Sequence, residues 1–410
     1  PYKSRRKKAV VYYRDNNGDL KPMPPTMSHW YTHYCEGSEE LHKFNFPLKF
    51  RRRFRLPHHC FVDLREKVKQ ESMLDDGCFR RWRPGRSVLG PSGMGPPVHI
   101  ELLLLTALRY LGRGWTFDDV EEATAISEEV CRQFFHEFIR WGSTKLYEEY
   151  VKIPETTEEA TEIAEKEYRV AGFPGCVGSM DGTHVEHSRI SFAHRQSHMS
   201  FKLPFTARSY NLCVSHRRKI YSTTDGHPAR WNDKSLVKFD KLATALHEGK
   251  HPLCDLPFEL YEYNEAGEIV KEKYKGGWLL VDNGYLNWGV TIPPMKETDT
   301  RAELRFSKWL EGMRKDVECT FGILKGRWRI LKAGIRVHGT EKCDQIWKTC
   351  CALHNMLLFA DGMDKNFKSG WTGELGNFQP HHLPQAVRTM MERLDNRPID
   401  NSAMGRGNDG

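Results

Sequence analysis

One segment near the middle of the chain constrains the fold more than any other. Residues 176–186 read Cys-Val-Gly-Ser-Met-Asp-Gly-Thr-His-Val-Glu. The small and apolar run that leads into Asp181 and Gly182 predicts a buried strand, which ends by delivering a carboxylate to the edge of a sheet. An Asp-Gly pair after an apolar run is more often a simple turn, so this acid gains meaning only together with others.

Two later segments carry further acids in comparable settings. Residues 278–285 read Trp-Leu-Leu-Val-Asp-Asn-Gly-Tyr and predict a second strand that ends at Asp282. Residues 314–325 predict a helix that carries Glu318. Carboxylate oxygens are the ligands that Mg²⁺ and Mn²⁺ prefer, and a set of three leaves positions open for substrate phosphates. The sequence therefore predicts a metal site at Asp181, Asp282 and Glu318, which could hold two ions.

Two other acids compete for the second position. Asp225 and Asp233 both lie between the two predicted strands. Asp233 and its neighbour Asn232 stand just before a predicted helix over residues 234–247, where either side chain could cap the helix. We therefore prefer a capping role for Asp233.

The motifs around these acids resemble those of a known family. They are Asp181-Gly-Thr-His-Val, Asp282-Asn-Gly-Tyr, Val317-Glu318 with the block 321–331, and the block 351–358 (Cys-Ala-Leu-His-Asn-Met-Leu-Leu). Over residues 40 to 360 the chain resembles PIF/Harbinger transposases and the related plant transposon proteins, which include Harbinger-derived nucleases. Asn283 departs from the pattern, because a small residue or glycine more often stands beside the second acid.

The resemblance carries expectations about fold and chemistry. It implies an RNase H-like α/β domain, a mixed sheet with flanking helices, whose Asp-Asp-Glu triad maps onto Asp181, Asp282 and Glu318. It also implies a divalent-metal nuclease with Mg²⁺ or Mn²⁺, and a separate Myb-like accessory protein that brings the enzyme to DNA.

The order of patterned segments predicts the domain organisation. We expect a basic, mobile lead-in over 1–43, a small helical domain over 44–150, a linking helix over 151–169, the catalytic domain over 170–362 and a tail over 363–410. Helical spacing recurs at 57–69, 98–111, 116–124 and 127–141. The last two segments suggest a helix-turn-helix that could enter a DNA groove, although Glu128, Glu129 and Glu137 are poorly suited to facing phosphates.

Positive charge is concentrated at the start of the chain. Residues 1–60 hold thirteen Lys or Arg and five acids, an excess of eight that equals the net charge of the whole chain, +8. Basic residues that alternate with aromatics suit phosphate binding. The candidate DNA contacts are Arg51, Arg52, Arg53 and Arg55, with Lys325, Arg327 and Arg329 after the helix of Glu318.

Composition and cysteine spacing indicate the cellular compartment of the protein. No run of eighteen apolar residues exists, so no membrane span is predicted. Eleven cysteines include no Cys-x-x-Cys pair, which favours reduced thiols in the nucleus, with the cytoplasm as the alternative, and disfavours a zinc site.

Three functions fit these patterns. The first is a DNA endonuclease or transposase that cuts phosphodiester bonds and could join the freed 3′ end to a target. The second is a domesticated protein that binds DNA or a partner without cutting, which the three retained acids disfavour. The third is an RNA-cutting relative, which the same fold would permit. Self-association remains open.

Overall fold

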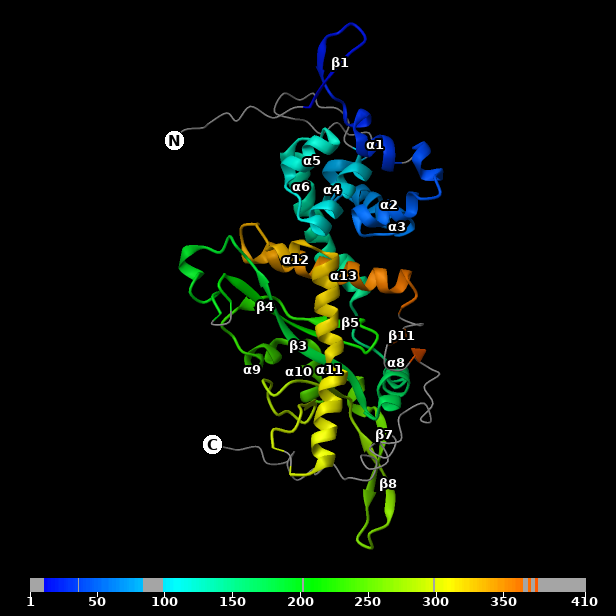
Figure 1. The fold of residues 1–410 in the computed structure, drawn as a ribbon, viewed down its shortest axis with the longest axis vertical. Coiled ribbons are helices and arrows are strands. Elements are labelled where there is room, and N and C mark those ends of the chain that lie inside the picture. Colours follow the sequence, from blue (N-terminus) through cyan, green and yellow to red (C-terminus); the bar gives the residue numbers. More distant parts are fainter. Residues whose placement is uncertain are drawn as a thin grey trace. The chain divides into compact units, whose positions relative to one another are not determined.

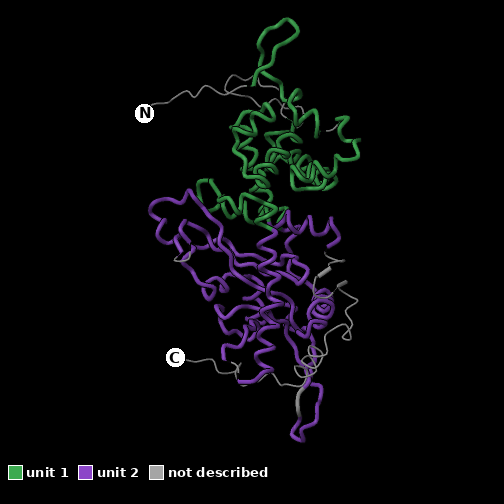
Figure 2. The backbone as a smooth tube through the Cα atoms, viewed as in Figure 1, with its two compact units in different colours: residues 1–147, 324–350 green, residues 148–323, 351–410 purple. Residues whose placement is uncertain are grey.

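The structure is a computed structural model that describes residues 11–35, 37–83, 99–200, 203–297, 299–363, 368–369 and 373–374. The chain divides into two compact units (Figure 2). Unit 1 comprises residues 1–147 and 324–350, and unit 2 comprises residues 148–323 and 351–410. The later boundaries fall inside two long helices, α11 (Arg301–Arg327) and α13 (Thr340–Ala360), which are labelled in Figure 1.

Unit 1 is mainly helical, as the sequence predicts for this part of the chain. Its elements are β1 (Tyr12–Arg14), β2 (Leu20–Pro22), η1 (Pro25–Met27), α1 (His29–Tyr34), η2 (Glu39–His42), α2 (Phe46–Phe54), α3 (His58–Met73), η3 (Arg80–Trp82), α4 (Ile100–Arg113), α5 (Phe117–Thr124), α6 (Glu128–Trp141), η4 (Gly142–Leu146) and α12 (Ile330–Ala333), and α7 (Tyr147–Tyr150) begins at its boundary. The four predicted helical segments correspond to α3, α4, α5 and α6. Thr116 and Asp119 form a capping box that starts α5.

Ordered structure begins earlier in unit 1 than the predicted lead-in over 1–43 allows. Trp30 and Tyr34 of α1 are buried, and each packs edge-on against Phe54 of α2, with ring centroids 5.2 and 5.1 Å apart. Edge-to-face aromatic pairs of this kind add stabilisation beyond their buried area. A six-residue helix shows no sustained period in the sequence, so pattern reading misses it.

The predicted helix-turn-helix corresponds to α5, α6 and the link between them. Phe134, Phe135 and Phe138 of α6 are buried. On its outer surface, Arg132 pairs with Glu129 and Arg140 pairs with Glu137. These pairs balance the outer charge of α6, and contact between this helix and DNA remains a prediction.

Unit 2 combines a mixed sheet with helices, which confirms the predicted mixed α/β class. Its elements are α8 (Thr157–Ile163), η5 (Ala164–Tyr168), η6 (Arg169–Ala171), β3 (Cys176–Glu186), η7 (Phe192–His194), β4 (Ala207–Val214), β5 (Ile220–Thr223), β6 (His227–Pro228), α9 (Asp233–Leu236), η8 (Val237–Phe239), α10 (Lys241–His247), η9 (Pro252–Asp255), β7 (Pro257–Tyr263), β8 (Ile269–Lys275), β9 (Trp278–Leu280), β10 (Thr291–Ile292), β11 (Lys368–Ser369) and β12 (Gly373–Glu374). Strands β7 and β8 form a separate two-stranded antiparallel hairpin.

The main sheet has the strand order β10-β9-β3-β4-β5, and β6 also pairs with β4. Strand β4 runs antiparallel to both of its neighbours, β3 and β5, whereas β9 is parallel to β3 and β10 is parallel to β9. The central strand β3 does not end at Asp181 as predicted. It continues to Glu186, because β4 pairs with every residue from Ser179 to Glu186.

Helix α11 packs onto the core of this sheet. Leu310 lies in one hydrophobic cluster with residues of β3 and β9, among them Met180 and Leu279. The indole nitrogen of Trp309 also donates a hydrogen bond to the carbonyl oxygen of Ala171, at 2.6 Å. A capping box starts the helix, in which the Glu303 carboxylate accepts the N–H of Thr300 and the Thr300 hydroxyl accepts the N–H of Glu303. These contacts fix the face that α11 turns toward the sheet, and with it the position of Glu318.

A buried acid interrupts the helix predicted over residues 234–247. One carboxylate oxygen of Asp240 accepts the backbone N–H groups of Leu242 and Ala243, both at 3.0 Å, and so caps α10. The other oxygen accepts a hydrogen bond from the Asn211 side chain at 3.2 Å. The segment therefore consists of α9, η8 and α10, and burial raises the pKa of Asp240.

Three further predictions concern membrane spans, the domain boundary and the C-terminal tail. Within those ranges, none of the helices combines the length and apolar character that a bilayer crossing requires. Unit 1 includes residues 324–350, whereas the sequence predicts one catalytic domain over 170–362. Most of the predicted tail over 363–410 lies outside the described residues.

Candidate functional site

The register of two parallel strands brings the first two predicted acids together. Ser179 of β3 lies opposite Leu280 of β9. Asp181 and Asp282 each follow two residues further along, and side chains two residues apart on a strand share a face. Asp181 therefore lies within β3, beside the end of β9, and Asp282 lies two residues past that end. The charge of Asp282 raises the pKa of Asp181, so the two carboxylates lie close together.

Each of these acids is held by a glycine that follows it. One oxygen of Asp181 accepts the backbone N–H of Gly182, and one oxygen of Asp282 accepts the backbone N–H of Gly284, both at 2.8 Å. A Cβ atom at position 284 would lie 2.9 Å from that Asp282 oxygen. Glycine is needed at this position because a side chain would collide with the carboxylate.

The third predicted acid is connected to the first through an arginine. In α11, Nη1 of Arg314 lies 2.9 Å from Oδ2 of Asp181, and Nη2 lies 3.1 Å from Oε1 of Glu318. Arg314 and Glu318 are one helical turn apart, so both can reach the strand end. The guanidinium group occupies the space between the two carboxylates.

The acids thus lie near one another, but they are not arranged as a complete set of metal ligands. Within the part of the chain that the structure describes, no group of three or more His, Cys, Asp or Glu side chains is arranged to hold a metal ion. The donor set suits a hard divalent cation, because it consists of carboxylate oxygens. A positive group already stands between two of these acids, which shows that the site accommodates a cation.

Burial and charge together perturb the first acid. The pKa of Asp181 is raised to about 6, mainly because the carboxylate is buried. Arg314 and the N–H of Gly182 lower the pKa, whereas the charges of Asp282 and Asp233 raise it further. A buried carboxylate crowded by like charges is typical of functional sites.

Asp233 is a fourth acid at this place, and its preferred role as a helix cap is wrong. The cap of α9 is Asn232, whose side chain accepts the N–H of Ser235 at 3.0 Å. The Asp233 oxygens lie 2.8 and 2.9 Å from the positions that Cβ atoms would take at Gly182 and Gly284. The adjacent Asn232 and Asp233 could have indicated this role, because one side chain is enough to cap the helix and the other can then contact the site. Asp225 is exposed instead.

The predicted DNA-contacting arginines lie in unit 1. Arg51, Arg52 and Arg53 are exposed on α2. Arg55 differs, because it ends α2 in a left-handed conformation (φ 66°), and its side chain packs where a Cβ of Gly112 would be. Burial and the neighbouring charges of Arg113 and Arg329 lower the pKa of Arg55. Residues distant in sequence therefore form one cationic cluster, which consists of Arg55, Arg113 and Arg329.

The remaining two predicted contacts are less accessible than Arg329. Lys325 and Arg327 are half-buried near the end of α11, and Arg329 is exposed. Burial lowers the pKa of Lys325. A structural role therefore competes with phosphate binding at Lys325.

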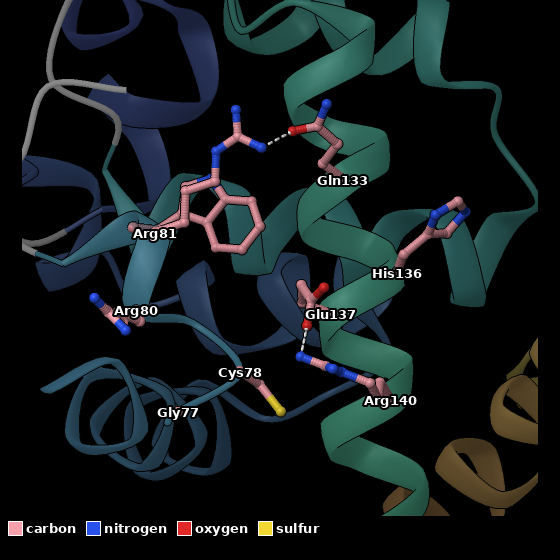
Figure 3. Close-up of a pocket in the computed structure, with 9 residues that line it drawn as sticks. Gly77, Cys78, Arg80, Arg81, Gln133, His136, Glu137 and Arg140 are labelled. Atoms are coloured by element: carbon pink, nitrogen blue, oxygen red, sulfur yellow. Dashed lines mark hydrogen bonds and ion pairs between the residues drawn. The ribbon is translucent and has the colours of Figure 1, made fainter. Parts of the chain in front are cut away.

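Unit 1 also has an open hollow on α6 that sequence reasoning did not find (Figure 3). It measures about 460 Å³, and its lining includes Arg80, Arg81, His136 and Arg140. Arg81 donates a hydrogen bond to Gln133, and Arg140 pairs with Glu137. Burial, with the charges of Lys342 and Arg132, lowers the pKa of His136 to about 4, so this histidine is neutral at pH 7.

A pH-dependent stability measurement tests the contact between Arg314 and Asp181. The raised folded-state pKa of Asp181 means that this group costs stability as pH rises from about 4 through about 6. Arg314→Met should raise the pKa further, so the variant should lose additional stability above pH 6. Each added pKa unit corresponds to about 1.4 kcal/mol. Urea unfolding between pH 4 and 8 without metal measures this loss.

Arg314→Lys is the matched control, because it keeps the positive charge and should follow the parent protein more closely. Stability curves of Arg314→Met and the parent that run parallel over the whole pH range would contradict the assigned contact.

Comparisons with known proteins agree with the motifs. The family model described as DDE superfamily endonuclease matches residues 180–355. "Protein ALP1-like" of Arabidopsis thaliana is 22% identical over 64% of this chain and 62% of its own length. "Putative nuclease HARBI1" of Homo sapiens is 24% identical over 60% and 62%, and its Bos taurus counterpart is 23% identical over 76% and 80%.

The chain covers less than two thirds of the length of the Arabidopsis and human proteins. No solved structure matches the chain. Asp181, Asp282 and Glu318 all lie inside the matched region. The resemblance drawn from the motifs is thereby confirmed: residues 180–355 of this chain match the model of DDE superfamily endonucleases, and its curated relatives include proteins named as nucleases.

Proposed function

We propose that this protein is a divalent-metal-dependent DNA endonuclease of the Harbinger transposase type. The observation that carries the proposal is the parallel register of β3 and β9, which aligns Asp181 with Asp282. The guanidinium group of Arg314 contacts both Glu318 and Asp181, so these two carboxylates lie on either side of it. The family match supports a nuclease, and the requirement for metal and the DNA substrate are our inference.

The strand order supports an RNase H-like sheet. Three antiparallel strands, β3, β4 and β5, precede the helices α9 and α10, and the parallel strands β9 and β10 then extend the other edge. Helix α11 follows and carries Glu318. This is the order expected when two strand acids and a helix acid form an Asp-Asp-Glu triad.

The acids of this site have distinct tasks in the proposed reaction. Asp181 and Asp282 each direct one oxygen to a glycine N–H. The second oxygen of Asp181 contacts Arg314 and would become available to a ligand when Arg314 moves away. Divalent ions, when bound, would activate the attacking oxygen and stabilise the leaving oxygen of the phosphodiester. Glu318, whose side chain is half exposed, can move toward Asp181 once Arg314 releases it. Arg314 is then free to neutralise a phosphate of the substrate.

Phosphate binding by unit 1 would supply much of the affinity for DNA. The exposed arginines of α2 and the cluster of Arg55, Arg113 and Arg329 provide positive charge. The family resemblance supports a separate Myb-like accessory protein, and composition supports a nuclear location. Both belong to our proposal, together with the possibility of self-association. Joining of the cut 3′ end to a target also belongs to this proposal, and RNA remains the alternative substrate.

One observation favours a second function, a domesticated protein that binds DNA or a partner without cutting. Arg314 already neutralises Asp181 and Glu318 with two ion pairs. A site satisfied in this way is stable without a metal, so retention of the acids does not by itself require catalysis.

Cleavage of labelled duplex DNA with Mg²⁺ or Mn²⁺ separates the two functions. Asp181→Asn, Asp282→Asn and Glu318→Gln should each reduce cutting by more than about 100-fold, because even changes around metal ligands cost up to that much. Asp233→Asn should also impair cutting, since Asn232 remains to cap α9. The exposed Asp225→Asn is the control and should retain activity.

Thermal melting of each variant with and without metal completes the assignment. The parent protein should gain stability from the metal, because a ligand that binds only the folded state stabilises it, and the three acid variants should not. No metal-dependent cutting and no metal-induced stabilisation in the parent would favour the non-cutting function.

The salt dependence of DNA binding tests the role of α2. Replacing Arg51, Arg52 and Arg53 together by Ala should reduce the slope of log K against log salt by up to about 2.7, because each neutralised phosphate contributes about 0.9. The matched control replaces Lys271, Lys273 and Lys275, three exposed lysines of β8, and should leave the slope unchanged. Equal slopes for both triple variants would remove α2 from the DNA interface.

A further inference from the structure

A partly exposed cluster of three aromatic rings surrounds the segment that carries Asp233: His227 lies in β6, Trp231 lies in the loop after it, and Phe239 lies in η8. The ring of Trp231 stacks on His227 with centroids 4.7 Å apart and planes 14° apart. Phe239 contacts both, at 4.5 Å from His227 and 5.5 Å from Trp231. Trp231 is 39% exposed and Phe239 is 52% exposed. Large aromatic side chains that remain in water together, as these do, indicate an interaction surface.

The scaffold beneath this aromatic cluster holds it in place. His227 and Pro228 form β6, which pairs with Ser209 and Arg208 of β4. The N–H of Trp231 donates to the carbonyl oxygen of Pro228 at 2.9 Å. Phe239 ends η8, directly before the buried Asp240. Rigid rings lose little conformational freedom when a ligand binds, so the cluster is prepared for stacking.

The cluster also lies close to the acids of the site. Trp231 is two residues before Asp233, so their Cα atoms are at most about 7.6 Å apart. The Asp233 carboxylate in turn reaches the space beside Gly182 and Gly284. His184, three residues after Asp181, contacts the carbonyl oxygen of Ala229 through Nε2 at 3.3 Å. The aromatic cluster and the acids therefore adjoin each other through Asp233 and His184.

The charges around the rings indicate the chemistry of the ligand. Arg230, Lys234 and Lys238 are exposed on the same segment. The acid among them, Asp233, directs its carboxylate toward Gly182 and Gly284. Aromatic rings bordered by cations are the combination that binds single-stranded nucleic acid, because bases stack on the rings and phosphates meet the charges.

We propose that His227, Trp231 and Phe239 form a stacking platform for an unpaired base of the substrate strand, next to the phosphodiester that is cut. This inference rests on the proposed nucleic-acid function and adds a substrate feature to it: the strand is unpaired at the site. The platform holds the displaced base, and the neighbouring cations hold its phosphates.

A pair of DNA ligands isolates the stacking contribution. Both are the same duplex with a short single-stranded extension, which carries normal bases in one ligand and abasic sugars in the other. The phosphates are identical, so any difference in affinity reports contacts to bases. Fluorescence anisotropy with the full chain in EDTA measures binding without cutting. The parent protein should bind the extension with bases about 10-fold more tightly.

Variants then assign this preference to the platform. Trp231→Ala and, separately, Phe239→Ala should abolish the difference between the two ligands, whereas Trp231→Phe should retain most of it. Phe192→Ala is the matched control, because Phe192 is 91% exposed in the same unit and belongs to no such cluster in the described structure. Thermal melting checks that each variant is folded.

The outcomes separate this inference from the proposed nuclease function. Equal affinity for both ligands in the parent, a preference for fully paired DNA, no binding at all, or an intact preference in both alanine variants would overturn the platform. Metal-dependent cutting could still be observed in the first, second and fourth cases. A preference that depends on Trp231 in a protein that does not cut would support the platform and contradict the nuclease.

Discussion

The site depends on one constraint, the parallel pairing of β9 with the central strand β3. Ser179 opposite Leu280 aligns the two strands, and the acids follow at equal distances. A shift of the register by one residue would turn one carboxylate to the other face of the sheet. Pairing with β4 on the other side of β3 and the packing of α11 on the core both stabilise this register. The position of Glu318 follows from the packing of α11.

Electrostatics at this strand end are balanced by Arg314. Two other acids influence Asp181, whose pKa of about 6 reflects burial together with the charges of Asp282 and Asp233. The guanidinium group offsets part of this repulsion. Leaving a buried charge without a partner is costly, so a cation of some kind is required here. The proposed metal binding would therefore compete with the Arg314 ion pairs for the same carboxylates.

Sequence patterns predicted the elements of this site better than their boundaries. The acids were recognisable because apolar runs and glycines surround Asp181 and Asp282, and helical spacing surrounds Glu318. The role of Asp233 could not be predicted, because capping and site contact look identical until Asn232 is seen to cap α9. The assignment of residues 324–350 to unit 1 depends on tertiary packing, which local periodicity does not contain.

The most direct test of this account is a crystal structure of the protein with Mn²⁺, with anomalous scattering used to locate the metal. We expect a peak coordinated by oxygens of Asp181 and Asp282, with Glu318 turned toward it and Arg314 displaced from at least one carboxylate. Metal–oxygen contacts should be close to the roughly 2.0–2.2 Å of hard divalent ions. A saturating Mn²⁺ concentration that leaves this strand end without a peak, and both Arg314 ion pairs intact, would contradict it.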